Sequence, residues 1–337
     1  MPVRRWAWPA LVPAVLFPTD AAAHPGTPWI GPNELPYAWT LDPVSLLPLA
    51  LAWWLFGRGL ARRPSVGRSR AAAYAAGTAW LLLALVWPLD AWGETLFSAH
   101  MAQHLVLTVV APPLLLLARP AGPVLAGLPT ATLRRRGARG LRAVRRGLEP
   151  LLRPGPAALV HGLALWLWHA PVAFDAALAD DWLHRAEHLS FFATALLFWA
   201  MVLRAPRLGG MAPVAAAGAL LLTLMHSGLL GMLIAFAPVP LYAWYGPRTA
   251  AWGLTPLEDQ QLAGLVMWVP AGFAYMGAGL WLLAGWMNRT GPGPSATSPG
   301  HGSGALAAGG LDEPDRTRPF RHQPRAWERG CGCWRAG

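Results

Sequence analysis

The sequence contains no lysine, so all 27 of its basic Lys+Arg residues are arginine, and only 13% of its 337 residues are charged. A soluble domain normally carries about a quarter charged residues. The low charge, together with 55% hydrophobic residues, therefore excludes an ordinary soluble enzyme or binding domain. Only two cysteines occur, Cys331 and Cys333, and one such neighbouring pair excludes a disulfide-stapled fold.

The net charge of +11 would by itself also fit a nucleic-acid-binding protein. The arginines, however, are concentrated in short segments between apolar runs, which is the positive-inside pattern of membrane proteins. The 20 tryptophans are typical of a protein with aromatic belts at both membrane interfaces. We therefore expect contact with membrane lipid and no nucleic-acid partner.

The apolar runs predict an all-α, polytopic membrane protein with a bundle of seven transmembrane helices. The expected spans are residues 43–60, 71–89, 99–118, 156–174, 182–203, 211–237 and 257–286. Arginine-rich connections alternate with acidic or arginine-poor ones, which places the N-terminus outside and the C-terminus in the cytoplasm. Such a protein would be a multi-pass component of the cell membrane.

Prolines predict two local features of these spans. Pro112 and Pro113 should kink the third span, and neighbouring helices must then satisfy the carbonyls that lose their partners. Thr255, Pro256 and Glu258 predict a capping box at the start of the seventh span, with proline at the first helical position.

The two ends of the chain lie outside the expected membrane domain of residues 43–287. Residues 1–23 resemble a signal peptide, with a basic start, a short apolar region and a small-residue cleavage site. Residues 24–42 are then an external segment. Residues 288–337 are rich in glycine, proline, serine and arginine and predict a disordered cytoplasmic tail. Its two cysteines alone leave a metal site incomplete.

The connection 119–153 is the longest on the cytoplasmic side and is crowded with arginine. Two interpretations are open: the arginines bind anionic lipid headgroups or an acidic partner, or they only orient the protein in the membrane. The residues concerned are Arg134, Arg135, Arg136, Arg139, Arg142, Arg145 and Arg146.

Histidines gather at the ends of the spans that this topology places outside. His100 and His104 are four residues apart, as are His184 and His188, so each pair lies on one face of a helix. Ionisable residues within membrane spans are functional hypotheses by default. We therefore predict a metal site at the outer face. The candidate ligands and transfer positions are His100, His104, His169, His184, His188, His226, Asp259 and Met225.

Imidazole clusters suit copper, zinc or heme iron, and nearby methionine thioethers would favour Cu(I). A b-type heme held between spans, or a metal-free scaffold whose histidines only cap and pair helices, are the alternatives to a transient copper site. A channel is less favoured, because the polar residues gather at one face. Residues 184–188 also match the H-x-x-E-H pattern of zinc peptidases, but this short pattern lacks a third ligand nearby in the sequence.

Five segments occur in the same order in a known family. They are residues 98–113, 168–171, 184–199, 225–242 and 257–270. With them the chain, over residues 40–287, resembles the CtaG family of assembly proteins for the caa-type heme-copper cytochrome c oxidase. The resemblance implies a non-enzymatic membrane assembly factor with oxidase subunits as partners. It also implies a role in supplying or placing copper.

Overall fold

The computed structural model describes residues 30–63 and 65–290, which belong to one compact unit. Its long elements are all helical, which confirms the predicted all-α class. The predicted signal peptide, the start of the external segment, the tail from residue 291 onward and both cysteines lie outside the described residues.

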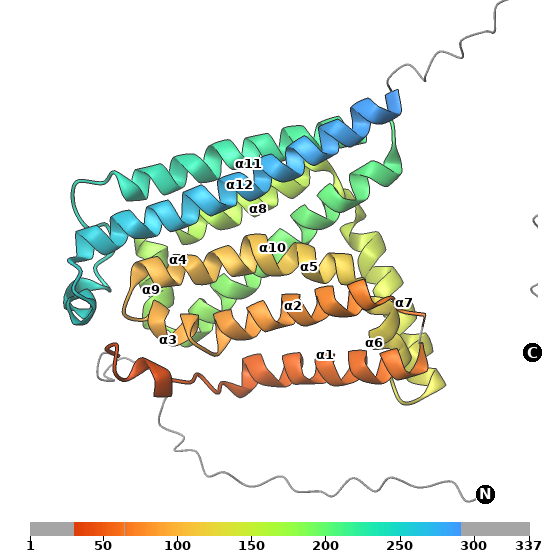
Figure 1. Cartoon of the computed structure of the whole chain (residues 1–337), viewed down its shortest axis with the longest axis horizontal. Coiled ribbons are helices and arrows are strands. Elements are labelled where there is room, and N and C mark those ends of the chain that lie inside the picture. Colours follow the sequence, from red (N-terminus) through yellow and green to blue (C-terminus); the bar gives the residue numbers. More distant parts are fainter. Residues whose placement is uncertain (1–29, 64, 291–337) are drawn as a thin grey trace, which may run out of the picture. The chain divides into compact units, whose positions relative to one another are not determined.

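The helices follow one another along the chain with short connections. They are α1 (Pro43–Arg62), α2 (Arg68–Leu85), α3 (Leu89–Gly93), α4 (Phe97–Leu105), α5 (Ala111–Ala118), α6 (Ala121–Gly127), α7 (Ala131–Leu148), α8 (Pro154–Trp168), α9 (Pro171–Ala179), α10 (Asp181–Leu208), α11 (Ala212–Ala235) and α12 (Pro256–Thr290), with short 3₁₀ helices at Leu35–Tyr37, Glu149–Leu152 and Gly246–Trp252. Figure 1 shows the long helices running alongside one another, with α3 and α9 at one end of the bundle and α6 and α7 at the other.

Five of the described helical segments are long and apolar enough to cross a membrane: α1, the α4–α5 run, α10, α11 and α12. A sixth candidate is the bent pair α8 and α9, if the two helices form one span. Helix α2 has 18 residues, but it begins with Arg68 and Arg70 and is not among the candidates. The protein is therefore a helical membrane protein with five or six candidate spans, where the sequence predicted seven.

The predicted third span is interrupted by a π-helical turn, Val106–Val110, between α4 and α5. Pro112 and Pro113 follow this turn, in the first turn of α5, where a missing backbone N–H is tolerated. The carbonyl of Thr108, four residues before Pro112, accepts a hydrogen bond from Trp199 Nε1 of α10 at 2.9 Å. A neighbouring helix thus satisfies this carbonyl, as the sequence predicted.

The predicted fourth span, 156–174, is not one continuous helix, because the chain bends by 73° between α8 and α9. Pro171 is the first residue of α9, and Ala170 before it has an extended backbone, with φ −64° and ψ 127°. A proline disfavours the helical conformation for the residue that precedes it. The break leaves His169 in a non-helical position between the two helices.

The segment 119–153 is helical over most of its length, in α6 and α7. Helix α7 is amphipathic, with Leu133 and Val144 on an exposed apolar stripe and its arginines around it. At the other end of the bundle the predicted capping box of α12 is confirmed. The backbone N–H of Thr255 donates to Glu258 Oε2 at 2.8 Å, and the N–H of Glu258 donates to Thr255 Oγ1 at 3.3 Å.

Candidate metal centre

The start of α4 is fixed by a carboxylate from α12. The residue before α4, Leu96, offers no side-chain cap. Asp259 supplies one: it accepts hydrogen bonds from the backbone N–H groups of Phe97 at 2.6 Å and Ser98 at 3.1 Å, and from Ser98 Oγ at 2.5 Å. A carboxylate at a helix N-terminus satisfies free N–H groups and complements the helix dipole. Asp259 therefore positions the turn of α4 that carries His100.

The two predicted histidine pairs face each other across α4 and α10. The rings of His100 and His104 lie 4.3 Å apart, with their Nε2 atoms at 2.8 Å, and those of His184 and His188 lie 4.2 Å apart. Between the helices, His100 lies 5.3 Å from His184 and His104 lies 5.3 Å from His188, measured between ring centroids. The structure thus brings four of the predicted residues into one cluster.

His169 joins this cluster from the break between α8 and α9. Its ring lies 5.7 Å from that of His104. Its Nδ1 donates to the carbonyl of Leu165 at 2.8 Å, because a carbonyl can only accept. That bond fixes the proton on Nδ1 and leaves the lone pair of Nε2 available as a ligand.

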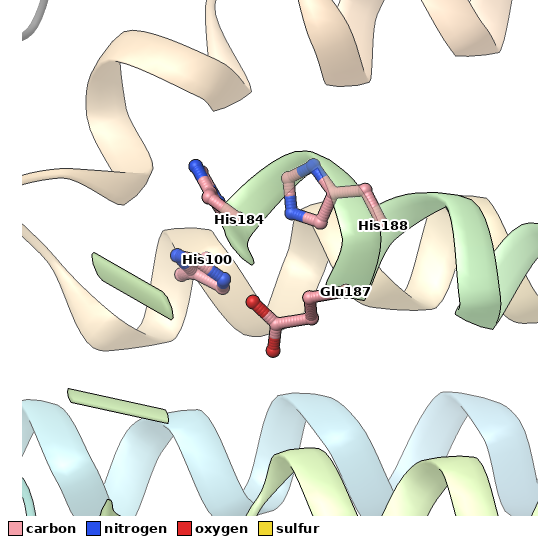
Figure 2. A group of neighbouring side chains, drawn as sticks. All are labelled: His100, His184, Glu187 and His188. Atoms are coloured by element: carbon pink, nitrogen blue, oxygen red, sulfur yellow. The ribbon is translucent and has the colours of Figure 1, made fainter. Parts of the chain in front are cut away.

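Glu187 is the residue that sequence reasoning did not select. It is fully buried, and its Oε1 lies 3.7 Å from Nε2 of His104. Ligand atoms of His100, His184, Glu187 and His188 all lie within 4.8 Å of one another. Figure 2 shows these four side chains gathered between α4 and α10. The signal was present in the H-x-x-E-H spacing, since residues i, i+3 and i+4 share one helix face.

The cluster contains buried polar atoms that have no hydrogen-bond partner within the described part of the chain. Such atoms normally cost about 1–3 kcal/mol each. They include Nδ1 of His104, Nε2 of His169, His184 and His188, and both oxygens of Glu187. A bound cation would satisfy several of them at once. The donor set of imidazoles and one carboxylate fits copper(II), zinc or iron(II).

Aromatic rings enclose the cluster. Phe174 lies 5.1 Å from the ring of His100, and Phe191 lies 4.7 Å from that of His104. His100 is 1% and His188 is 9% exposed. The burial of His100, Glu187 and His188 argues against the peptidase interpretation of residues 184–188, because a polypeptide substrate cannot reach these side chains.

The loop before α12 holds the break at His169 and the end of α3 in place. The hydroxyl of Tyr242 donates to the carbonyl of His169 at 2.9 Å, and that of Tyr245 donates to the carbonyl of Gly93 at 3.1 Å. A Cβ at Gly93 would lie 3.2 Å from Cα of His100, so glycine allows α3 to cover this end of the cluster closely. Both tyrosines are buried.

Two acidic residues lie beside the cluster, Asp90 in α3 and Glu94 directly after this helix. Burial raises the pKa of Asp90 to about 6, although Asp90 accepts a hydrogen bond from Gln103 Nε2 at 2.9 Å. Burial, and after it the neighbouring charge of Asp90, raises the pKa of Glu94 to about 8. Burial thus shifts the pKa of both carboxyl groups toward neutral pH.

The structure places the remaining predicted residues outside the four-residue group. His226 lies against α8, where its Nδ1 accepts from Trp166 Nε1 at 3.4 Å. Met225 is 64% exposed on α11, and Met101 is packed in an apolar cluster with Phe97. Asp259 acts on α4 as the cap described above. The four residues closest together thus offer nitrogen and oxygen ligands and no sulfur.

The fold and the cluster define a class: a multi-pass helical membrane protein with a buried group of potential metal ligands between two of its helices. The family comparison then gives its family. A family model described as "Cytochrome c oxidase caa3 assembly factor (Caa3_CtaG)" matches residues 51–289, and the chain belongs to this family. The resemblance seen in the sequence and the predicted membrane location are thereby confirmed. No significant match was found among the curated proteins or the solved structures.

Proposed function

We propose that this protein binds copper transiently in its histidine cluster and passes it to a caa3-type cytochrome c oxidase during assembly. The observation that supports this most is the meeting of His100 with His184, Glu187 and His188, whose ligand atoms lie within 4.8 Å of one another. The family supplies the link to the oxidase. In this role copper is the cargo, and oxidase subunits are the partners.

The arrangement suits release as well as binding. His104 and His169 lie beside the four-residue group and carry free ring nitrogens of their own. An ion can therefore exchange one imidazole for another without leaving the cluster. Exchange of this kind, one ligand at a time, is what transfer to a partner requires. We place His226 and Met225 of α11 as later positions on the transfer route.

We further infer that α2 crosses the membrane, which gives seven spans with the cluster on the outer side. An 18-residue helix is about 27 Å long, close to the thickness of the hydrocarbon core. Figure 1 shows α2 running alongside α1 and α5. The arginine-rich α7 then lies on the cytoplasmic side, as the positive-inside rule requires.

The topology is tested with single cysteines in a chain whose Cys331 and Cys333 are replaced by serine. Glu34→Cys and Val144→Cys are probed in intact cells with a membrane-impermeant maleimide. Three crossings between these positions predict that only position 34 is labelled. Labelling of both positions would mean that α2 does not cross.

The copper proposal is tested by metal analysis and an optical spectrum of the purified, detergent-solubilised full chain. We expect copper in the wild type, its loss in the double variant His100→Ala/His184→Ala, and its retention in the control variant His161→Ala, whose histidine lies in α8 and contacts Thr194 outside the cluster. A Soret band that disappears in the double variant would instead show a b-type heme. Equal copper content in all three proteins would place the metal outside the cluster and refute the proposed site, and absence of metal from all three would leave a metal-free scaffold.

The same variants connect the site with its biological role. In cells, His100→Ala should lower oxidase activity and oxidase copper content while the protein remains in the membrane at its normal level. Oxidase with its full copper content in this variant would refute the delivery proposal.

A further inference from the structure

A second potential binding site lies at the end of the bundle opposite the histidine cluster. Here α1, α6 and α7 border an open cavity of about 750 Å³. Four arginines line it, together with apolar residues such as Leu125: Arg62 and Arg63 from the end of α1, and Arg134 and Arg135 from α7. Four guanidinium groups around one cavity create a strong positive potential, which favours the binding of an anion.

The cavity has a rigid framework. A Cβ at Gly59 would lie 1.9 Å from the carbonyl oxygen of Pro123, so α1 and α6 pack with their backbones in contact. Arg62 Nη1 donates to the carbonyls of Ala126 at 2.6 Å and Leu128 at 2.8 Å, at the end of α6. Arg134 Nη1 donates to the same Leu128 carbonyl at 2.9 Å. These bonds hold both side chains at the cavity wall.

The two held arginines retain binding capacity. A guanidinium has five N–H donors, and the bonds to α6 use only Nη1 of Arg62 and of Arg134. Their remaining donors match the fork geometry that binds phosphate in a bidentate manner. Arg63 and Arg135 add two further guanidinium groups on the same cavity.

No carboxylate among the described residues lines this cavity. Within the described chain, the carboxylate nearest to α7 in sequence is Glu149, which pairs with Arg204 at 2.6 Å. The other described acidic residues fall in the segments 34–42, 90–94, 175–187 and 258–259, toward the end of the bundle with α3 and α9. The cavity therefore lacks an internal counter-ion.

We propose that this cavity binds the phosphate group of an anionic phospholipid. Its place favours a lipid over a free anion, because it lies at the end of the candidate span Pro43–Arg62, where the headgroup region of a bilayer is expected to begin. Helix α7, which forms one wall, exposes Leu133 and Val144 on an apolar stripe, as helices that lie in the membrane interface do. Leu125 and Ala126 in the lining can contact the glycerol and the first acyl carbons. The inference is independent of the copper proposal.

The test is native mass spectrometry of the full chain in neutral detergent, titrated separately with phosphatidylglycerol, phosphatidylcholine and inorganic phosphate. The test variant is Arg63→Gln/Arg135→Gln, which spares the two arginines bonded to α6. The matched control is Arg139→Gln/Arg142→Gln, which removes the same charge from α7 outside the cavity. An arginine near an anionic headgroup contributes about fivefold in affinity, so the test variant should bind phosphatidylglycerol roughly 25-fold more weakly.

The expected pattern is preference for phosphatidylglycerol, lost in the test variant and kept in the control. Equal losses in both variants would show general attraction by α7 and overturn the cavity. Inorganic phosphate that binds as tightly as the lipid would show a free-anion site. Absence of lipid binding in the wild type, or equal binding of phosphatidylglycerol and phosphatidylcholine, would also overturn the proposal.

Discussion

Two of the buried carboxylates near the cluster, Glu187 and Asp259, allow one chemical change to separate metal binding from folding. Glu187 points its unpaired oxygens into the histidine group, whereas Asp259 uses its oxygens to cap α4. Replacing each carboxylate by the amide of the same shape, in Glu187→Gln and Asp259→Asn, removes one negative charge at each position. We predict opposite effects of these two substitutions on stability and on copper affinity.

The expected magnitudes follow from the partners of each group. Asp259 accepts three hydrogen bonds, and an amide can replace only part of them. Hydrogen bonds to charged groups contribute about 1.5–3 kcal/mol each, so Asp259→Asn should lower the free energy of unfolding by about 2–4 kcal/mol. Glu187 makes no side-chain hydrogen bond among the described residues, so replacing its buried carboxyl group by an amide should leave the metal-free protein equally or more stable.

Copper affinity should respond in the opposite order. Glu187 is the single anionic member of the four-residue group. Even groups that only support metal ligands change affinity by about 10–100-fold, so Glu187→Gln should weaken copper binding at least tenfold. Asp259→Asn should change the affinity of the folded protein less than this.

The assay combines thermal unfolding of the metal-free protein with copper titration against a competing chelator, both in the same detergent. The reasoning would be refuted if Glu187→Gln lowered the melting temperature as much as Asp259→Asn does and left copper affinity unchanged. Glu187 would then be a structural group, and the cluster would lose its proposed anionic ligand.

Further predictions concern the surroundings of the cluster. The pKa of Glu94 is raised to about 8 in the folded protein, above its ordinary value of 4.5, so the free energy of unfolding should fall as pH rises from about 4.5 through about 8. Glu94→Gln should flatten this dependence in melting curves recorded at pH 6 and pH 9. Gly93→Ala would place a Cβ 3.2 Å from Cα of His100, so copper affinity should fall by titration while Gly57→Ala, with open space around it, has no such effect. Trp199→Phe retains an aromatic side chain but removes the N–H donor to the buried carbonyl of Thr108. It should lower the free energy of unfolding by about 1–3 kcal/mol in chemical denaturation. An unchanged unfolding curve for Trp199→Phe would mean that the π-helical turn satisfies Thr108 by itself.

Much of this architecture could be predicted because it depends on local rules. Apolar runs located the helices, the spacing of four residues placed each histidine pair on one face, and Thr255 with Glu258 marked the start of α12. The bend after Trp168 also has a local signal, Pro171, but the apolar run continues past this proline and therefore predicted one continuous helix. Helix α2 was predicted as a span from its apolar run, but its two arginines at the start reduce its mean hydropathy, and it is not among the five or six candidate spans of the described residues.

The parts of the site that were not predicted depend on rotation and depth of helices, which one sequence does not determine. Asp259 and His226 were both predicted as members of the metal site at the outer face. In the structure Asp259 caps α4, whereas His226 packs against Trp166. Met225 is adjacent in sequence to His226 but faces away from the core. Glu187 was within a recognised pattern, and only the approach of α4 from another part of the chain makes it a member of the cluster.

The π-helical turn Val106–Val110 sets the angular phase between the two halves of its span. One additional residue in a helix rotates everything beyond it by about 100°. Helix α4, which bears His100, and α5, which packs on α2, can therefore face different neighbours although they belong to one span. Deleting one valine from this turn would restore a continuous α-helix. If α5 kept its packing, the histidines of α4 would then rotate away from α10, so the turn determines which neighbour the histidines face.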